Sequence, residues 1–214
     1  NEMNEVTCAN CHSIHGKGVL PTYNGLNPPD KSPTIKKFVT TFLPNQAEIC
    51  WQCHQPIRAA NFKPSHHPII EGKVKCSDCH NPHTSSHGKL LSENVNRICF
   101  SCHGGIVPEK ARSVHKVAVE GNCVKCHDPH GAKNKYNLLQ AGNELCSGCH
   151  QRLAKEAAGN KFKHNPVEKG CLNCHTPHAS TNTLTLLKRD VPALCVACHK
   201  PDAPAFGKAH MGYR

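Results

Sequence analysis

Eight copies of the pentapeptide Cys-x-x-Cys-His account for all sixteen cysteines of this 214-residue chain. Two thiols three positions apart can form thioethers to the two vinyl groups of one porphyrin, while the adjacent imidazole reaches its iron. Zinc sites and disulfides also use cysteine pairs, but neither needs a histidine directly after every pair. The pattern therefore predicts eight covalently attached c-type haems, one on each motif.

The motifs assign two sets of residues. The predicted attachment residues are Cys8, Cys11, Cys50, Cys53, Cys76, Cys79, Cys99, Cys102, Cys123, Cys126, Cys146, Cys149, Cys171, Cys174, Cys195 and Cys198. The predicted proximal iron ligands are His12, His54, His80, His103, His127, His150, His175 and His199. Because such haems are attached outside the cytoplasm, and no basic-then-apolar leader is present, we expect a mature extracytoplasmic chain.

Eight haems would leave about 27 residues for each, too few for an ordinary side-chain core. The chain has 15 Gly, 16 Pro and few aromatic residues, which disfavours long helices. We therefore expect a multihaem cytochrome c fold: mostly irregular coil with short α-helices wrapped around a chain of stacked haems, and little or no β-sheet. No apolar stretch is long enough to be a transmembrane segment.

The motifs form an internal repeat of two alternating types. In type A, the motifs that begin at residues 8, 76, 123 and 171, a further histidine follows three positions after the motif histidine. Type B motifs, at 50, 99, 146 and 195, lack it. This predicts one domain, 1–214, built of four haem pairs at about 1–60, 61–108, 109–158 and 159–214, with an extended arm at 13–49.

Type A motifs, preceded by Gly and followed by Pro, are typical of turns, whereas type B motifs look helical. Asn45, Ser92, Asn143 and Asp190 are the expected N-caps of the type B helices. The longest predicted helix runs from about Glu144 to Ala158.

A low-spin haem needs a second axial ligand, and ten histidines remain after the motif histidines. A trailing type A histidine lies on the proximal side of its own haem, so we expect it to ligate a neighbouring haem. A second set precedes the type A motifs, where His66 is favoured over His67 because it aligns better with the others. His67 and His87 would then be surface or propionate-binding residues. The predicted distal ligands are His15, His66, His83, His115, His130, His164, His178 and His210.

The only methionines are Met3 and Met211, so bis-histidine ligation and low potentials are expected throughout. No motif departs from the attachment pattern, as the open site of a catalytic haem often does, and no phosphate-binding loop or nucleophile elbow is present. We therefore expect no enzyme activity, with a multihaem reductase as the alternative. The formal charge of +11 would be offset by haem propionates, so nucleic acid is not an expected partner.

Two repeated segments carry a family resemblance. They are Ser65-His66-His67-Pro68 with Cys76-Ser77-Asp78-Cys79-His80-Asn81-Pro82-His83, and Cys171-Leu172-Asn173-Cys174-His175-Thr176-Pro177-His178. They resemble the doubled Cys-x-x-Cys-His family of multihaem cytochromes c. Residues 50–103 are similar to the periplasmic decahaem cytochromes of outer-membrane porin-cytochrome conduits.

This resemblance implies electron transfer across or beyond the outer membrane, with other multihaem cytochromes as donors and acceptors. It implies a periplasmic or outer-membrane-associated location and an outer-membrane porin as partner. Multihaem cytochromes of similar haem density also polymerise into extracellular filaments. A subunit of such a filament, assembled head to tail from identical copies, is therefore the alternative function.

Overall fold

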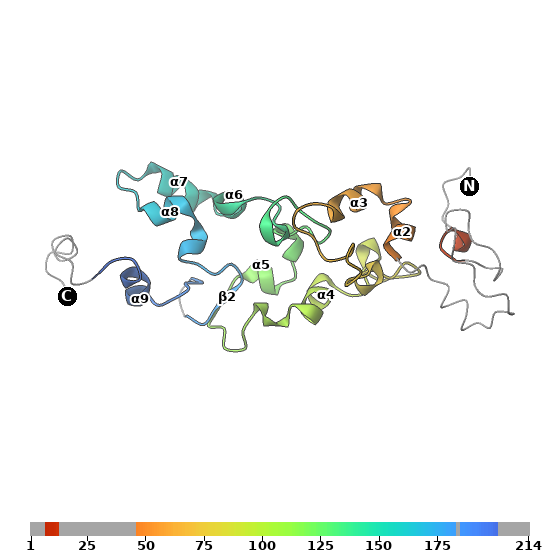
Figure 1. Ribbon diagram of the computed structural model, residues 1–214. Helices are drawn as coiled ribbons and strands as arrows, with labels where there is room; N and C mark the ends of the chain where they lie inside the picture. The colour runs from red at the N-terminus through yellow and green to blue at the C-terminus, as the bar shows by residue number, and fades with distance from the viewer. Residues whose placement is uncertain (1–6, 13–45, 183–184, 201–214) are drawn as a thin grey trace.

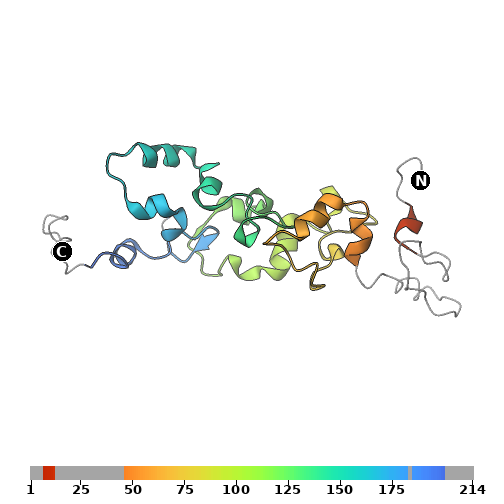
Figure 2. The ribbon, with the colours of Figure 1, turned by 45° about the horizontal axis from the view of Figure 1, so that its top comes forward.

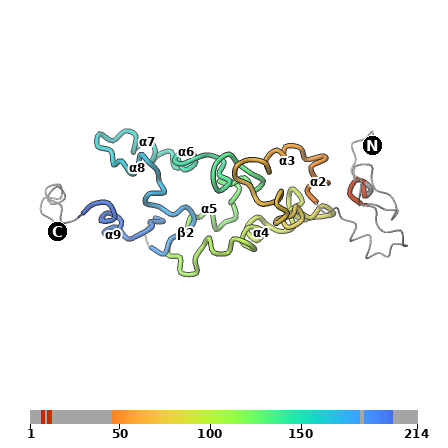
Figure 3. The backbone as a smooth tube through the Cα atoms, in the orientation of Figure 1, coloured from red at the N-terminus to blue at the C-terminus, as the bar shows by residue number. Residues whose placement is uncertain are grey.

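The computed structural model describes residues 7–12, 46–182 and 185–200. The described chain is long and thin, and it doubles back along its long axis, so that segments far apart in the sequence lie side by side, such as residues 113–114 and 179–180 (Figures 1 and 2). Helices α2 and α3 lie toward one end and α9 toward the other. The tube in Figure 3 follows the chain between them without a central layer of helices or sheet.

All helices of the described residues are short. They are α2 (Gln46–Trp51), α3 (Gln55–Asn61), α4 (Val95–Cys102), α5 (Lys116–Val119), α6 (Gly142–Ser147), α7 (Gln151–Gly159), α8 (Asn165–Lys169) and α9 (Val191–Val196). Short pieces of this kind gain little from helix propensity and depend on packing.

Type A motifs form the turns expected of them. The first three residues of each are a single 3-10 turn, at Cys8–Asn10, Cys76–Asp78, Cys123–Lys125 and Cys171–Asn173. Backbone bonds to the first cysteine then fix the motif histidine, as from His80 N to Cys76 O at 2.9 Å. The turn therefore places both thiols and the imidazole of one motif in a fixed relation.

The single long helix predicted from Glu144 to Ala158 is wrong. Two helices, α6 and α7, occupy this region, and the chain bends between them at His150, which has φ −88° and ψ 45°. The same bend ends α4 at His103, with φ −106° and ψ 36°. The motif histidine is thus the C-cap of α4, whereas His54 and His150 are the N-caps of the helices α3 and α7 that follow their motifs.

Of the four expected N-caps, one precedes its helix as predicted, two do not, and one lies outside the described residues. Asp190 directly precedes α9 as predicted, but Asn94, in place of Ser92, caps α4 by accepting a bond from Arg97 N at 3.0 Å. Ala141 precedes α6, so the prediction for Asn143 is wrong. Asn45 lies outside the described residues, as does most of the predicted arm at 13–49.

The sheet of the described residues is minimal: β1 (Ser113–Val114) pairs antiparallel with β2 (Ala179–Ser180). Isolated bridges join three type A motif histidines to a later leucine: His80 to Leu91, His127 to Leu138 and His175 to Leu187. The prediction of short helices, irregular coil and little sheet is confirmed.

Few side chains of the described residues are buried. Trp51, Ala47 and Ile69 form a small cluster near α2, and the other buried apolar residues are Ala60, Ala132 and Ala179. Many large apolar side chains stay exposed instead, Leu90 and Leu172 among them. The described segments therefore bury too little apolar surface to hold the fold by themselves. Within these segments, no helix is both apolar and long enough to cross a bilayer.

Candidate haem-binding sites

Type A motif histidines face trailing histidines from the next type A unit. The ring centroids of His80 and His130 are 6.2 Å apart at an interplanar angle of 14°, and those of His127 and His178 are 6.0 Å apart. In the first unit His12 faces His83 at 5.7 Å. Each pair joins residues from neighbouring repeats, as the position of the trailing histidine predicted.

Type B motif histidines face histidines that precede a type A motif. His150 pairs with His115, and His199 with His164, both at 6.1 Å between ring centroids. The third pair is His103 with His67, at 6.0 Å and 58°. Distal partners therefore come from later repeats for type A motifs and from earlier residues for type B motifs.

These separations fit an iron between the rings. A metal–imidazole bond is about 2.0–2.1 Å, so two rings on opposite sides of one iron have nitrogens about 4 Å apart and centroids about 6 Å apart. His12 and His83 come slightly closer, with 3.4 Å between their Nε2 atoms. No cluster of three or more His, Cys, Asp or Glu among the described residues could hold a metal ion by protein groups alone. Two protein ligands per iron suit a metal whose other four bonds come from a porphyrin.

His66 does not occupy the position that the sequence favoured for it. Its Nδ1 contacts Lys63 O at 2.7 Å and its Nε2 contacts Glu71 Oε1 at 3.2 Å. The bond to the Lys63 carbonyl, and then the bond to Glu71, raise the pKa of His66. Both partners are acceptors, so these two contacts favour the form of His66 that carries a proton on each nitrogen, and this form has no lone pair for iron. The structure brings His67, rather than His66, to the ring of His103.

Two motif histidines, His54 and His175, pair with no other ring among the described residues. Two predicted distal ligands, His15 and His210, lie outside the described residues. His87 is described and joins no ring pair there.

Backbone carbonyls contact the Nδ1 atoms of several candidate iron-ligating histidines. In the type A units, His80, His127 and His175 contact Lys89 O, Tyr136 O and Thr185 O through Nδ1 at 2.9, 2.7 and 2.7 Å. On the distal side of the type B pairs, His67 contacts Pro129 O at 2.6 Å and His115 contacts Pro177 O at 3.1 Å. A carbonyl only accepts, so Nδ1 is the donor and Nε2 keeps the lone pair that a metal requires.

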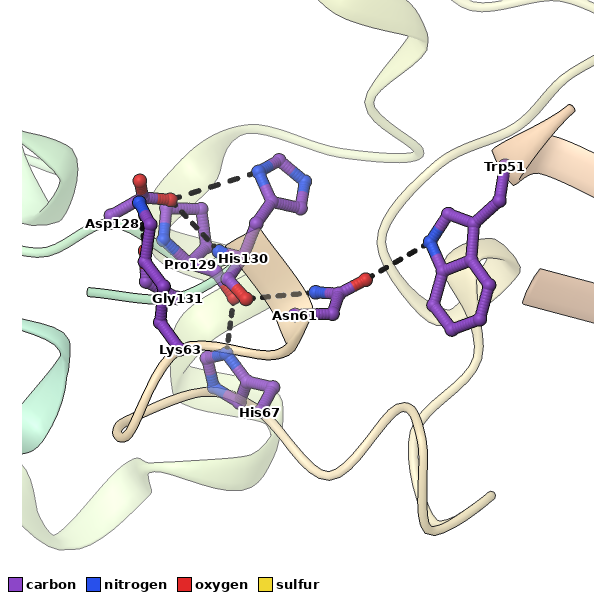
Figure 4. Close-up of polar contacts among 8 residues, drawn as sticks. All are labelled: Trp51, Asn61, Lys63, His67, Asp128, Pro129, His130 and Gly131. Atoms are coloured by element: carbon purple, nitrogen blue, oxygen red, sulfur yellow. Dashed lines mark hydrogen bonds and ion pairs between the residues drawn. The ribbon is translucent and has the colours of Figure 1, made fainter. Parts of the chain in front are cut away.

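The segment 126–130 serves three imidazole pairs at once. His127 belongs to one pair, His130 to a second, and Pro129 O holds His67 of a third (Figure 4). Asn61, which is only 1% exposed, fixes this segment by donating to His130 O at 2.8 Å and accepting from Trp51 Nε1 at 3.1 Å. The small core near α2 therefore positions a predicted iron ligand.

Burial favours the ligating form of the trailing histidines. Desolvation lowers the pKa of His130 and outweighs the opposing charge of Asp128, and desolvation also lowers the pKa of His178. A lowered pKa keeps imidazole neutral at physiological pH, and neutral imidazole is the form that binds metals.

Thiols of successive motifs interact. First cysteines are hydrogen-bonded where a type B motif precedes a type A motif, as in Cys50 with Cys76, whose hydrogen bond raises the pKa of Cys50 and lowers that of Cys76 to about 7. Where type A precedes type B, burial and then the charge of the next second cysteine raise the pKa of the earlier one, as in Cys11 near Cys53. All sixteen thiols are free, as thioether formation requires. The interacting pairs, in chain order, are Cys11 with Cys53, Cys50 with Cys76, Cys79 with Cys102, Cys99 with Cys123, Cys126 with Cys149, and Cys146 with Cys171.

Side-chain amides fix these junctions. Asn143 Oδ1 accepts from Cys171 N at 2.8 Å, and Gln46 Oε1 accepts from Ser77 N at 3.0 Å. Asn96 donates to Val119 O at 2.8 Å, just before the following type A motif. The sequence interpretation missed this role, although each amide stands three or four positions before the first cysteine of a type B motif.

Family comparison matches these repeats. The family model of the doubled CXXCH motif matches residues 66–107, 115–155 and 164–204, more than half of the chain, and each match holds one type A and one type B motif. Together with the imidazole pairs, this defines a multihaem c-type cytochrome. The chain belongs to the doubled CXXCH motif family.

One relative is similar over part of the chain. The protein described as multiheme cytochrome MtrA of Shewanella baltica is 33% identical over 100 residues, 46% of this chain. The matched region spans 24% of that protein's length.

Proposed function

We propose that this chain is an electron-transfer protein that holds eight low-spin, bis-histidine c-type haems in the order of their motifs. The observation that carries the proposal is the interaction between thiols of successive motifs. It is a hydrogen bond where type B precedes type A, as in Cys146 with Cys171, and a charge interaction where type A precedes type B, as in Cys11 with Cys53. Because each thiol would become a thioether on the edge of its porphyrin, adjacent thiols bring neighbouring porphyrin edges together. Haem supplies one-electron chemistry when bound, by cycling between ferric and ferrous iron.

The protein groups set the rest of the chemistry. We propose the six observed imidazole pairs as axial ligands, with His67 taking the place first assigned to His66. His15 and His210 remain the proposed distal ligands for the irons of His54 and His175. The four haem-pair repeats at about 1–60, 61–108, 109–158 and 159–214 belong to the same proposal.

The cellular setting is proposed from the similarity to MtrA. We place the protein outside the cytoplasm, in the periplasm or in association with the outer membrane, where it would pass electrons between other multihaem cytochromes, together with an outer-membrane porin. A role in transfer rather than catalysis fits motif histidines that face a second imidazole, since catalysis at iron needs an open position.

Stopped-flow reduction tests the function. The purified holoprotein is mixed with a soluble low-potential donor, and oxidation by a second multihaem cytochrome is then followed in the haem absorption bands. Rapid, complete and reversible reduction of all haems supports electron transfer. Catalytic reoxidation of the reduced haems by nitrite or hydroxylamine would instead indicate a reductase.

Electron microscopy of the same preparation tests whether the protein is a conduit component or a filament subunit. Discrete particles, alone or with a barrel, support the proposed conduit component. Regular filaments of identical copies would contradict it.

A further inference from the structure

Three type A units share a left-handed backbone conformation that a turn alone does not require. Each places two successive non-glycine residues in the left-handed region: Lys89 and Leu90 at φ 59° and 54°, Tyr136 and Asn137 at 60° and 56°, and Thr185 and Leu186 at 41° and 59°. Apart from Asn137, none is a residue type that readily adopts this conformation. Such costly geometry persists only where the surroundings over-determine it, and it gathers at functional sites.

Each left-handed pair presents its carbonyls to one motif histidine. The first carbonyl of the pair accepts from the imidazole Nδ1, as Tyr136 O does from His127 at 2.7 Å. The second accepts from the backbone N–H that follows the histidine, as Asn137 O does from Asp128 N at 2.8 Å. With both residues in an ordinary extended or right-handed conformation, two successive carbonyls would not meet these two donors.

Residues from the preceding repeat hold the pair in place. Asn137 N donates to Ser65 Oγ at 2.8 Å, and Ser65 Oγ donates to Asn137 Oδ1 at 2.7 Å. In the next repeat Leu186 N donates to Ser113 Oγ at 3.2 Å. The following leucine carbonyl accepts a side-chain bond in each unit, as Leu138 O does from Asn134 Nδ2 at 3.0 Å.

We propose that these left-handed pairs are braces that orient the proximal imidazole of type A haems and lower the potential of those haems. The proposal rests on haem ligation by His80, His127 and His175. A hydrogen bond from Nδ1 to a carbonyl makes the imidazole a stronger donor, and a stronger donor favours ferric over ferrous iron. Tyr136 and Ser65 are thus positioning residues that act on the haem through His127.

Two substitutions at Tyr136 separate the backbone from the side chain. The Tyr136 side chain is 80% exposed, so its removal costs little packing. Tyr136→Gly keeps the left-handed conformation accessible, whereas Tyr136→Val opposes it because a β-branched residue is strained there. Ser65→Ala loosens the brace from the other side. Asn160→Ala, at an exposed position after the end of α7 and outside every attachment motif, is the control.

The measurement is a redox titration of each holoprotein followed by electron paramagnetic resonance. We expect Tyr136→Val and Ser65→Ala to shift one low-spin haem to higher midpoint potential, with the other haems unchanged. Tyr136→Gly and Asn160→Ala should match the wild type. If Tyr136→Val fails to incorporate its haems, the midpoint potentials of Ser65→Ala alone test the proposal. An unshifted potential in Ser65→Ala, or an equal shift in Tyr136→Gly and Tyr136→Val, would overturn the brace.

A separate variant tests the ligation on which the brace depends. His178→Ala should turn the haem of His127 high-spin and so identify its signal in the titration. If His178→Ala leaves every haem low-spin, the ligand assignment of the proposed function fails. If His178→Ala acts as expected and the potential in Ser65→Ala does not move, only the brace fails.

Discussion

The ring of His67 lies 6.0 Å from the ring of His103, and the Nδ1 of His67 contacts the carbonyl of Pro129 at 2.6 Å. Two neighbouring repeats therefore meet at one candidate iron site: the repeat 61–108 supplies both imidazoles, and the type A turn of the repeat 109–158 supplies the carbonyl. Interleaving of this kind ties each haem site to its neighbours and explains how a chain with so few buried side chains holds a defined fold.

Replacing His67 by Ala removes an axial ligand, so we expect one haem to remain attached through its thioethers but to become high-spin. Electron paramagnetic resonance of the oxidised protein checks this. His66→Ala is the matched control, because the adjacent imidazole contacts Lys63 O and Glu71 and should leave every haem low-spin. A high-spin signal in His66→Ala and none in His67→Ala would reverse the assignment.

Replacing His130 by Ala should likewise give one attached, high-spin haem, that of His80, because the two rings face each other at 6.2 Å. The pyridine haemochrome assay checks that the haem content is unchanged, and carbon monoxide binding to the reduced protein should increase by one site. His87→Ala, whose ring joins no described pair, serves as the control. Wild-type carbon monoxide binding in His130→Ala would contradict the pairing.

A methyl group at Gly131 should destabilise the protein. Gly131 has φ +150°, and a Cβ there would lie 2.1 Å from Ala60 O, so the backbone must move. We expect Gly131→Ala to lower the free energy of unfolding by about 1–3 kcal/mol. Denaturant titration of the holoprotein measures the loss. Gly159→Ala, which adds its methyl to open space at the end of α7, should cost nothing; equal stabilities for the two variants would refute the close contact.

The proposed role of His210 follows from the sequence, and its substitution tests it. His210→Ala should leave the same haem content with one haem high-spin, because the iron of either His54 or His175 would lose its distal ligand. Electron paramagnetic resonance at low protein concentration is the measurement. A fully low-spin spectrum in His210→Ala would remove His210 from the ligand set.

The motifs and the alternation of type A and type B could be read from the sequence because haem attachment demands fixed spacing. That a trailing type A histidine belongs with a neighbouring haem could also be predicted, since it cannot reach the far face of its own haem; the partners of the type B motif histidines could not. The choice between His66 and His67 could not be predicted from the sequence. Both precede Pro68 closely, and the deciding contact, Pro129 O, stands 62 residues away from His67.

Two other features escaped sequence reasoning for physical reasons. The non-helical backbone of His150, between α6 and α7, breaks a stretch with strong helix formers, which override in the sequence any signal of the break. The left-handed pairs contain Lys, Leu, Tyr and Thr, which carry no turn signal; tertiary bonds such as that from Asn137 N to Ser65 override their preferences. An internal alignment of the type A units offers the one available signal, a leucine at a similar distance after each motif.

The central claim is that the haems follow the order of their motifs, each between the two imidazoles assigned to it. An electron cryo-microscopy or crystal structure of the holoprotein tests this most directly. The account predicts an unbranched row of eight haems in sequence order, with neighbouring edges meeting alternately at second and first cysteines, and irons between His80 and His130 and between His67 and His103. A branched or reordered row, or an iron held by His66, would contradict it.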